Sequence, residues 1–207
     1  MRKLLAIFAL MSLLALPAVS ASAAAAVAGG DWNVDANHSE VSFGVRHFFT
    51  PVTGSFAGYE VSLSFDRENP ASSRVTAKIP VANIDTGNDK RNAHLKTADF
   101  FDAQAYPYIT FESTSVKAVS DTQWVATGNL TIKDVTRQIE LPIELLGVME
   151  LPEMMQAQMG GTKEIASFRA SATIDRRDFG VGTGSWAETA VVGAGVELEI
   201  LVEANRK

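Results

Sequence analysis

Apolar and polar side chains alternate along most of the chain after residue 30. The apolar residues recur at every second position in eight segments, which are 41–45, 59–65, 75–81, 109–111, 124–132, 139–145, 166–174 and 196–202. A period of two is typical of strands with one face buried and one face in water. Gly, Pro, Asn, Asp and Ser between the segments predict short links, and therefore about eight antiparallel strands.

This series of strands predicts an all-β fold in which one antiparallel sheet closes on itself as a barrel. An eight-stranded barrel either fills its interior with side chains or holds one slender ligand. Small residues on the apolar phase favour an interior that leaves room, although alternating layers of small and large side chains remain an alternative. These small residues are Ala77, Ala126, Ala166, Ala170 and Ala172.

Two segments depart from the alternation. In the 84–107 connection, Thr86, Asn88 and Asp89 are candidate N-caps, and we expect one or two short helices there that end before Pro107. The 147–163 segment is too long for a tight hairpin and contains four methionines. It is compatible with a soft-metal site or an apolar flap, and the lack of nearby His and Cys favours the flap.

The N-terminus carries the features of a secretory signal. Arg2 and Lys3 precede an apolar run that extends to Val19, and Ala21-Ser22-Ala23 offers a cleavage site. We therefore expect residues 1–23 to be removed, with rival cleavage sites up to residue 28, which leaves one domain over residues 30–207. An uncleaved anchor is the alternative, because about 16 apolar residues approach the roughly 20 needed to cross a bilayer.

The charge balance excludes some classes of partner. The chain has 18 basic and 24 acidic residues and a net charge of −6, and loss of Arg2 and Lys3 with the signal would make it −8. A surface of this sign argues against binding to nucleic acid and to anionic membranes. The chain has no cysteine, which excludes disulfides and thiolate metal sites.

A series of short motifs, taken together and in order, resembles the YceI family. The motifs are Trp32-Asn33-Val34-Asp35, His38-Ser39-Glu40-Val41-Ser42-Phe43, Gly54-Ser55-Phe56, Ile84-Asp85-Thr86-Gly87, Arg91-Asn92-Ala93-His94-Leu95, Asp99-Phe100-Phe101-Asp102, Tyr106-Pro107-Tyr108-Ile109-Thr110-Phe111-Glu112-Ser113, Gly128-Asn129-Leu130-Thr131-Ile132-Lys133 and Arg177-Asp178-Phe179-Gly180. Any single motif is weak, but the series covers essentially the whole chain after the signal. Asp134, Ala194 and the methionine-rich segment depart from the family pattern, and these departures concern loops.

The resemblance implies a lipocalin-like barrel whose long apolar tunnel binds polyisoprenoid lipids, including quinone-like ones. On this basis we expect a periplasmic protein that sequesters, stores or transports an isoprenoid lipid, is not an enzyme and requires no other cofactor. The side chains expected to line the tunnel are Phe43, Val45, Phe56, Phe111, Leu130, Ile132, Phe168, Ile174, Phe179 and Trp186. At the tunnel mouth, donors to a lipid headgroup are expected from His38, His47, Arg91 and His94.

Two other functions remain open from the sequence. His38, His47 and His94 are a candidate zinc-ligand set for a metal-binding protein or hydrolase, although no H-x-H or H-E-x-x-H spacing places two of them on one element. A solid barrel with a structural or stress-protective role in the envelope is the other alternative. Phe48 and Phe49 form a candidate contact patch for homodimerisation or transient membrane contact, and shielding of the tunnel mouth is the alternative role for them.

Overall fold

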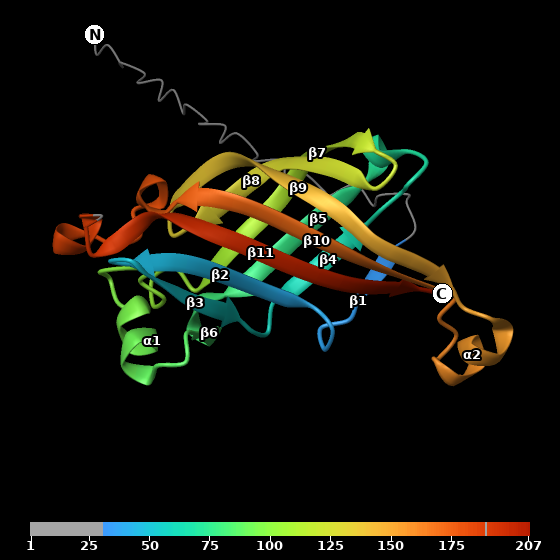
Figure 1. The fold of residues 1–207 in the computed structure, drawn as a ribbon, viewed down its shortest axis with the longest axis horizontal. Helices are drawn as coiled ribbons and strands as arrows, with labels where there is room; N and C mark the ends of the chain where they lie inside the picture. Colours follow the sequence, from blue (N-terminus) through green and yellow to red (C-terminus); the bar gives the residue numbers. More distant parts are fainter. Residues whose placement is uncertain (1–30, 189) are drawn as a thin grey trace, which may run out of the picture.

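One antiparallel sheet wraps into the elongated barrel of Figure 1. This computed structural model describes residues 31–188 and 190–207, so the expected signal peptide and its cleavage sites lie outside the described residues. The strands are β1 (Asp31–Val34), β2 (Glu40–His47), β3 (Thr50–Phe56), β4 (Glu60–Ser64), β5 (Arg74–Pro80), β6 (Ile84–Asp85), β7 (Tyr108–Ser120), β8 (Gln123–Ile132), β9 (Val135–Glu150), β10 (Glu164–Asp175) and β11 (Val192–Arg206).

These eleven segments follow eight paths around the barrel. β1 and β2 both pair with β11, at different heights, and so act as one interrupted strand. β3 and β4 share a second path, because β3 pairs with β2 and β4 pairs with β1. β5 and β6 share a third path, because β5 pairs with β4 and β6 pairs with β3. The β1–β4 and β1–β11 pairings close the sheet. The described chain therefore confirms the predicted eight-stranded antiparallel barrel.

The register between strands sets which side chains point inward. Phe43 on β2 and Ala172 on β10 both lie opposite Leu198 on β11, so apolar residues of neighbouring strands meet at one level. The intervening Ser171 and Glu197 are exposed on the outer wall. A shift of one residue in the pairing of a strand would move all of its apolar side chains from the barrel interior to the solvent-exposed face. The alternation therefore specifies the register strongly.

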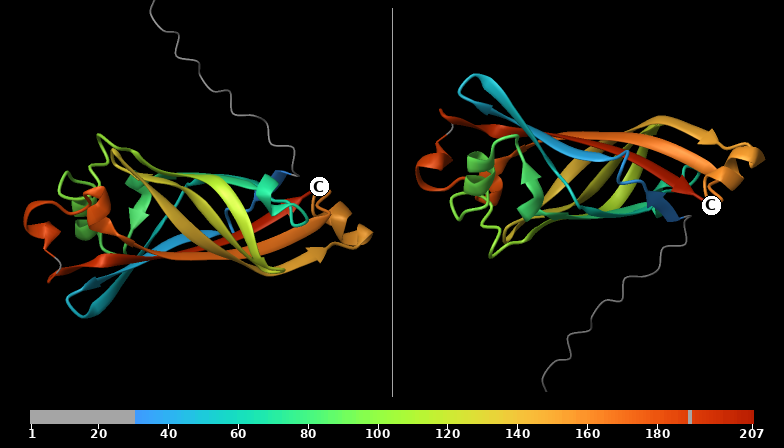
Figure 2. Two further views of the ribbon diagram at one scale, coloured as in Figure 1. Left: turned by 90° about the horizontal axis from the view of Figure 1, so that it is seen from above. Right: turned by 90° about the horizontal axis from the view of Figure 1, so that it is seen from below.

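Short helices gather at one end of the barrel, on the left in Figures 1 and 2. α1 (Asp89–Leu95) begins after Asn88, whose side-chain oxygen accepts a hydrogen bond from the Arg91 backbone N–H at 3.0 Å. This confirms a helix in the 84–107 connection and one of its predicted N-caps. The 3₁₀ helices η3 (Arg176–Phe179) and η4 (Gly184–Ala187) lie at the same end, which we call the α1 end.

A helix that the sequence did not predict lies at the opposite end, which we call the α2 end. α2 (Glu153–Gln158) occupies the methionine-rich segment, and β9 extends to Glu150, beyond the alternating stretch. Met154 on α2 is 77% exposed, so this six-residue helix has no buried apolar stripe from which to predict it. In the described part of the chain, no helix is long and apolar enough to cross a bilayer. Two further 3₁₀ helices, η1 (Pro70–Ser72) and η2 (Val81–Asn83), interrupt the β4–β5 and β5–β6 connections.

Buried side chains form two clusters inside the barrel. The larger cluster includes Phe111, Trp124 and Phe179, and the smaller one, toward the α2 end, contains Trp32 and Phe168 with Ala166 and Ala204. The half-buried Phe65 packs against both clusters. Its ring meets those of Trp124 and Phe168 in T-shaped, edge-to-face contacts, with ring centroids 5.0 and 5.1 Å apart. Phe65 therefore marks the boundary between the two clusters.

Candidate functional site

An apolar cavity of about 180 Å³ lies inside the barrel. Nine of the strands, β2–β5 and β7–β11, contribute to its wall, almost entirely through Val, Ile, Leu, Ala, Phe and Trp. The polar residues of the wall are Ser64, Ser73 and Arg74, which lie together where β4 leads into β5. The wall contains no acidic residue and no histidine. Its chemistry suits a hydrocarbon rather than a polar substrate.

The cavity is lined by six of the ten predicted tunnel residues, namely Phe56, Phe111, Leu130, Ile132, Phe168 and Ile174. The other four lie elsewhere. Phe43 packs on Phe56 with ring centroids 5.4 Å apart, and Val45 follows it toward the end of β2. Phe179 is buried at the α1 end, where Trp186 packs near it. Alternation identified inward-facing positions but not how far along the barrel the cavity extends.

Trp124 and Phe65 also line the cavity, and sequence analysis did not select them. Both occupy apolar positions in predicted strands, so the alternation predicts that they face inward. It does not distinguish a residue of the cavity wall from one in the packed core. Of the five small residues singled out, Ala77 and Ala170 line the cavity, whereas Ala126, Ala166 and Ala172 do not line it and pack in or against the buried clusters. Small residues therefore serve both roles that the sequence left open.

Glycine allows two aromatic rings to lie close against the barrel wall. A Cβ atom at Gly128 would lie 2.5 Å from the Phe111 ring and 2.7 Å from the Glu112 carbonyl oxygen. At Gly54, a Cβ would lie 2.5 Å from the Phe43 ring. Distances this short exclude any larger residue without movement of the neighbours. Gly128 thereby sets how far the Phe111 ring stands away from the cavity centre.

The α1 end of the barrel is closed by packed side chains, which we call the plug and define as Val81, Phe100, Arg176, Phe179 and Val181. All five are buried, and Arg176 is only 4% exposed. Its guanidinium donates hydrogen bonds to the carbonyl oxygens of Gly193, Val181 and Val192 at 2.9, 2.8 and 2.9 Å. Burial lowers the pKa of Arg176 from its usual value, and the nearby Asp175 opposes this effect. A buried cation thus ties the loop that follows η3 to the start of β11 at this end.

The α2 end instead has an open hollow of about 380 Å³, which we call the vestibule. Its apolar lining residues are Trp32, Phe65, Leu145, Val148 and Ala166. Its charged rim is formed by Asp66, Arg67, Glu68, Glu164 and Arg206. The Arg206 guanidinium forms an ion pair with Glu164 and lies 5.0 Å from the centre of the Trp32 ring. Phe65 lines both the vestibule and the inner cavity.

The four predicted headgroup residues line neither the cavity nor the vestibule. His38 lies on the turn between β1 and β2, with 65% of its side chain exposed. His47 ends β2 and its ring contacts that of Phe48 at 4.8 Å. Phe48 and Phe49 are exposed at the tip of this β2–β3 hairpin, as expected, and their partner remains a prediction.

The other two predicted headgroup residues are engaged within the α1 region. Arg91 donates hydrogen bonds from Nε to the Thr86 hydroxyl at 2.8 Å and from a terminal nitrogen to the Thr86 carbonyl at 2.6 Å. His94 Nε2 lies 3.0 Å from an Asp99 carboxylate oxygen, and its ring contacts Trp186. The hydrogen-bonding groups of Arg91 and His94, which the sequence predicts at a lipid headgroup, are thus engaged by residues of the same 84–107 connection.

The three histidines do not converge on one metal site. In residues 31–188 and 190–207, the cluster of metal-type ligands that forms is Asp35, His38 and Glu203, whose ligand atoms lie within 4.8 Å of one another. His38 Nδ1 is 2.9 Å from Asp35 Oδ2 and 3.7 Å from Glu203 Oε1. The hydrogen bond that Asp35 accepts from His38 raises the pKa of His38 and lowers the pKa of Asp35. This exposed turn contains a single histidine, so the structure lacks the His-rich zinc site considered from the sequence.

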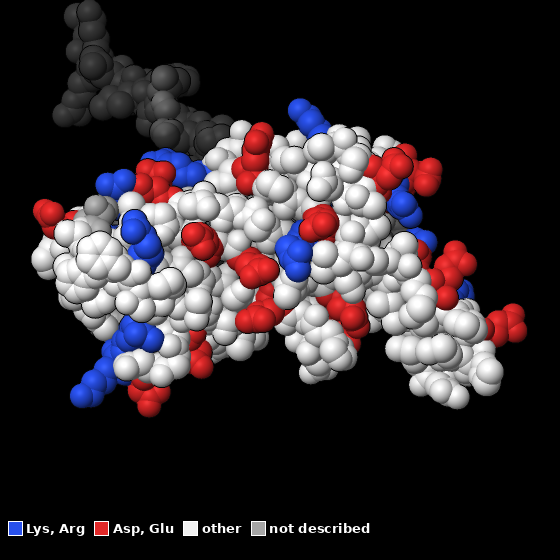
Figure 3. Space-filling view, viewed as in Figure 1, with Lys and Arg blue, Asp and Glu red and all other residues white. Residues whose placement is uncertain are grey.

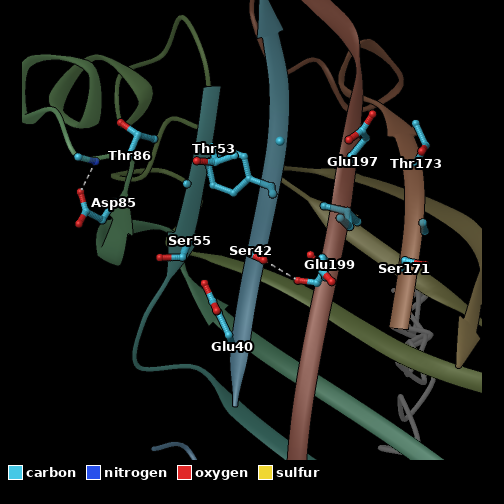
Figure 4. Close-up of a pocket in the computed structure, with 16 residues that line it drawn as sticks. Glu40, Ser42, Thr53, Ser55, Asp85, Thr86, Ser171, Thr173, Glu197 and Glu199 are labelled. Carbon is cyan, nitrogen blue, oxygen red and sulfur yellow. Dashed lines mark hydrogen bonds between the residues drawn. The ribbon is translucent and has the colours of Figure 1, made fainter. Parts of the chain in front are cut away.

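A larger hollow of about 1010 Å³ lies on the outer wall, across β3, β2, β11 and β10 (Figure 4). Hydroxyl and carboxylate side chains line it, including Ser42, Ser171, Glu197 and Glu199, and the Ser42 hydroxyl donates to the Glu199 backbone carbonyl at 3.0 Å. Acidic groups are spread over this face in Figure 3. Because this hollow is polar, burial of hydrocarbon there would gain little, and the smaller apolar cavity inside the barrel is the better candidate for an apolar ligand.

Comparison with known proteins agrees with this architecture. The Burkholderia cenocepacia protein BcnA, whose crystal structure is known, has a TM-score of 0.73 and 26% identity, with 83% of this chain and 99% of that chain covered. A polyisoprenoid-binding domain from Saccharophagus degradans, implicated in plant cell wall breakdown, has a TM-score of 0.62 and 15% identity, with 86% of this chain and 99% of that chain covered. The second likeness shows a shared fold.

Sequence relatives extend the same result. Protein YceI of Escherichia coli O6:H1 is 35% identical over 156 residues, which is 74% of this chain and 77% of the relative. The family model for the YceI-like domain matches residues 32–204, which span the whole barrel. With this match and the closed apolar barrel, the chain belongs to the YceI-like domain family.

Proposed function

We propose that this protein binds an isoprenoid lipid, polyprenyl or quinone-like, inside its barrel and acts in the periplasm as a carrier or reservoir. The observation that carries the proposal is the cavity inside the barrel, whose wall is apolar over nearly its whole surface. Membership of the YceI-like family supports it, as does the shared fold with a relative that is described as polyisoprenoid-binding. The export signal expected at residues 1–23 supports the periplasmic location.

The polar residues of the wall support a hydrocarbon ligand because the protein already satisfies them. The Ser73 hydroxyl accepts a hydrogen bond from the Asp66 backbone N–H at 3.0 Å. Arg74 donates to the carbonyl oxygens of Ser73 and Ala71 at 2.6 and 3.0 Å. Hydrocarbon burial gains about 0.8 kcal/mol per CH₂ group, so each five-carbon isoprene unit that is fully buried contributes roughly 4 kcal/mol at most. Affinity should therefore increase with chain length until the barrel is filled.

The volume of the cavity implies that a long chain must displace side chains. An engineered apolar cavity of about 150 Å³ accommodates a benzene molecule, so 180 Å³ holds a group of similar size. A chain of several isoprene units needs more space than this. The half-buried Phe65 and the branched residues of the wall can supply that space by changing rotamer. We therefore expect binding to be accompanied by rearrangement inside the barrel while the strand pairing is kept.

A binding role is proposed in preference to an enzymatic one because the cavity wall carries no base and no pair of reactive groups. Ser73 and Arg74 in this wall make the backbone contacts expected of structural residues. The histidines, which are the residues most suited to proton transfer near neutral pH, lie outside the cavity. A solid-barrel structural role is disfavoured by the presence of the cavity.

Native mass spectrometry tests this proposal directly. The protein would be purified from the periplasm of its own host, and any small molecule released by organic solvent would be identified. We expect a stoichiometric isoprenoid on the wild-type protein, and recovery from the periplasmic fraction without residues 1–23 would support export. A protein that repeatedly carries no lipid, and takes none up from added polyprenyl or quinone-like compounds, would refute the function.

A matched pair of variants locates the lipid. Ala170→Phe adds a ring to the cavity wall, and Ser171→Phe adds the same ring to the outer face of the same strand. A phenyl ring fills a cavity of this size, so Ala170→Phe should lose at least tenfold in lipid occupancy. Ser171→Phe should retain wild-type occupancy. Equal occupancy in both folded variants would place the lipid outside the inner cavity.

A further inference from the structure

The route by which a ligand reaches the cavity is decided by the two ends of the barrel. At the α1 end, the plug residues are buried and Arg176 bonds to three backbone carbonyls. Passage there would break these hydrogen bonds and expose Phe179 together with a buried charge. At the α2 end, the vestibule already reaches Phe65, and the same residue lines the inner cavity. Phe65 is thus the residue that the outer hollow and the inner cavity share.

Phe65 has the local structure of a movable side chain on a fixed backbone. Its carbonyl oxygen accepts a hydrogen bond from the Trp32 indole N–H at 3.1 Å, which anchors the main chain to β1. Its ring is only half-buried and rests edge-on against Trp124 and Phe168. Such contacts are individually weak, so rotation of the ring costs less than repacking a strand.

The segment that follows Phe65 is also free of the barrel ladder. β4 ends at Ser64 and β5 begins at Arg74, so residues 65–73 form a connection beside the vestibule. Its hydrogen bonds are mainly local, such as those from the Glu68 and Asn69 backbone N–H groups to Asp66 Oδ1, both at 3.0 Å. Segments held by few long-range bonds open at lower free energy than core strands.

Exposed apolar residues continue from the vestibule to the surface. Val148 lines the vestibule and is exposed, and Met149 beside it and Met154 on α2 are exposed as well. Figure 3 shows that the tip of the molecule at α2 is almost free of charged side chains on the face in view. Apolar side chains at α2 and within the vestibule thus offer contacts to a hydrocarbon chain, beside the charged residues of the rim, on its way to Phe65.

From this geometry we propose that the ligand enters through the vestibule at the α2 end and that the Phe65 ring is the gate to the cavity. This inference rests on the proposed lipid-binding function and adds the route and the gating residue. The plug keeps the α1 end closed while the ligand is exchanged. The predicted headgroup residues at that end take no part in uptake.

Single-site labelling tests the route without altering the core, because the chain has no native cysteine. Glu68→Cys on the vestibule rim and Lys90→Cys on α1 are both exposed positions that accept a bulky maleimide. The probe is a dansyl-labelled geranylgeranyl chain, transferred from phosphatidylcholine vesicles and followed by energy transfer from the three tryptophans, of which Trp124 lies in the cavity wall and Trp32 in the vestibule. We expect the label at residue 68 to slow uptake at least tenfold and the label at residue 90 to leave it within twofold.

A second pair of variants tests the gate. Phe65→Ala removes the gate ring, and Phe101→Ala removes a half-buried ring that packs on Phe56 at the α1 end. Phe65→Ala should accelerate both uptake and release at least fivefold, whereas Phe101→Ala should not. Equal rates in the two variants, or slowing by the label at residue 90 alone, would overturn the proposed route and gate. Absence of probe binding to the unlabelled wild-type protein at equilibrium would instead refute the lipid-binding function itself.

Discussion

Replacement of Arg176 by Met should destabilise the barrel much more than the same change at Arg177. Methionine keeps most of the aliphatic volume but removes the donors for three carbonyl oxygens at 2.8 to 2.9 Å. Each buried acceptor left without a partner costs about 1–3 kcal/mol, and relief of the guanidinium desolvation offsets part of that loss. We expect a net loss of about 3–5 kcal/mol, as when one partner of a buried charged interaction is removed.

Urea unfolding followed by tryptophan fluorescence measures this loss. With a slope of about 2 kcal/mol per molar urea, the Arg176→Met midpoint should fall by roughly 1.5–2.5 M. Arg177 is the matched control because it lies next in the chain but is exposed and pairs with Asp175. That pair lowers the pKa of Asp175 to about 2, so its small stabilising effect is present above pH 4 and is lost as the pH falls through about 2.

For Arg177→Met we expect a loss of at most about 1 kcal/mol at pH 7, since the pair is exposed to solvent. Similar midpoints for the two variants would refute the reasoning that Arg176 holds the plug together. A further outcome is that Arg176→Met loses much stability and also takes up lipid faster, with that extra uptake blocked by a label at residue 90 on α1. This result would further show that the plug is what closes the α1 end.

Two further predictions follow from short contacts and from a shifted pKa. In urea unfolding, Gly128→Ala should lose about 1–3 kcal/mol of stability, because the new Cβ would lie 2.5 Å from the Phe111 ring. The control Gly147→Ala should change stability by less than about 0.5 kcal/mol, because its Cβ would meet no atom within 4 Å. Equal losses of stability in the two variants would contradict this reasoning. NMR titration should give His38 a pKa above 6.5, and Asp35→Asn should return it toward that value. Because the folded-state pKa is raised, the stabilising effect of the pair is complete below the ordinary pKa and disappears as pH rises through the raised one; an unchanged His38 pKa in the variant would refute the assignment.

The strands were largely predictable because alternation reports a local property. A strand half-buried in a barrel must turn every second side chain inward, so Phe43, Phe111 and Phe168 could be assigned to the inner face from their spacing alone. The α1 helix was predictable for a similar reason, since Asn88 is a short-range N-cap. β9 extends beyond its predicted segment because its last residues are exposed and lose the alternation. In β7 the apolar series stops earlier, because the buried position after Phe111 is held by the polar Ser113 and a register shift follows it.

The headgroup residues were not predictable in this way. His47, Arg91 and His94 lie toward the α1 end, but their donors and rings are used by neighbours such as Thr86, Asp99 and Phe48. His38 is on the outer wall beside Glu203, which is far away in the sequence. A list of donor residues says nothing about which of them local partners will occupy.

The sequence by itself determined the fold class, the inward face of each strand and the apolar character of the interior, because all three depend on the order of side chains along single strands. The tertiary structure decided the extent of the cavity, which end is plugged and which end opens at Phe65. These features depend on how residues far apart in the sequence, such as Trp32, Phe168 and Arg176, pack and form hydrogen bonds. Those contacts form only once the barrel has closed and placed the residues around a common interior.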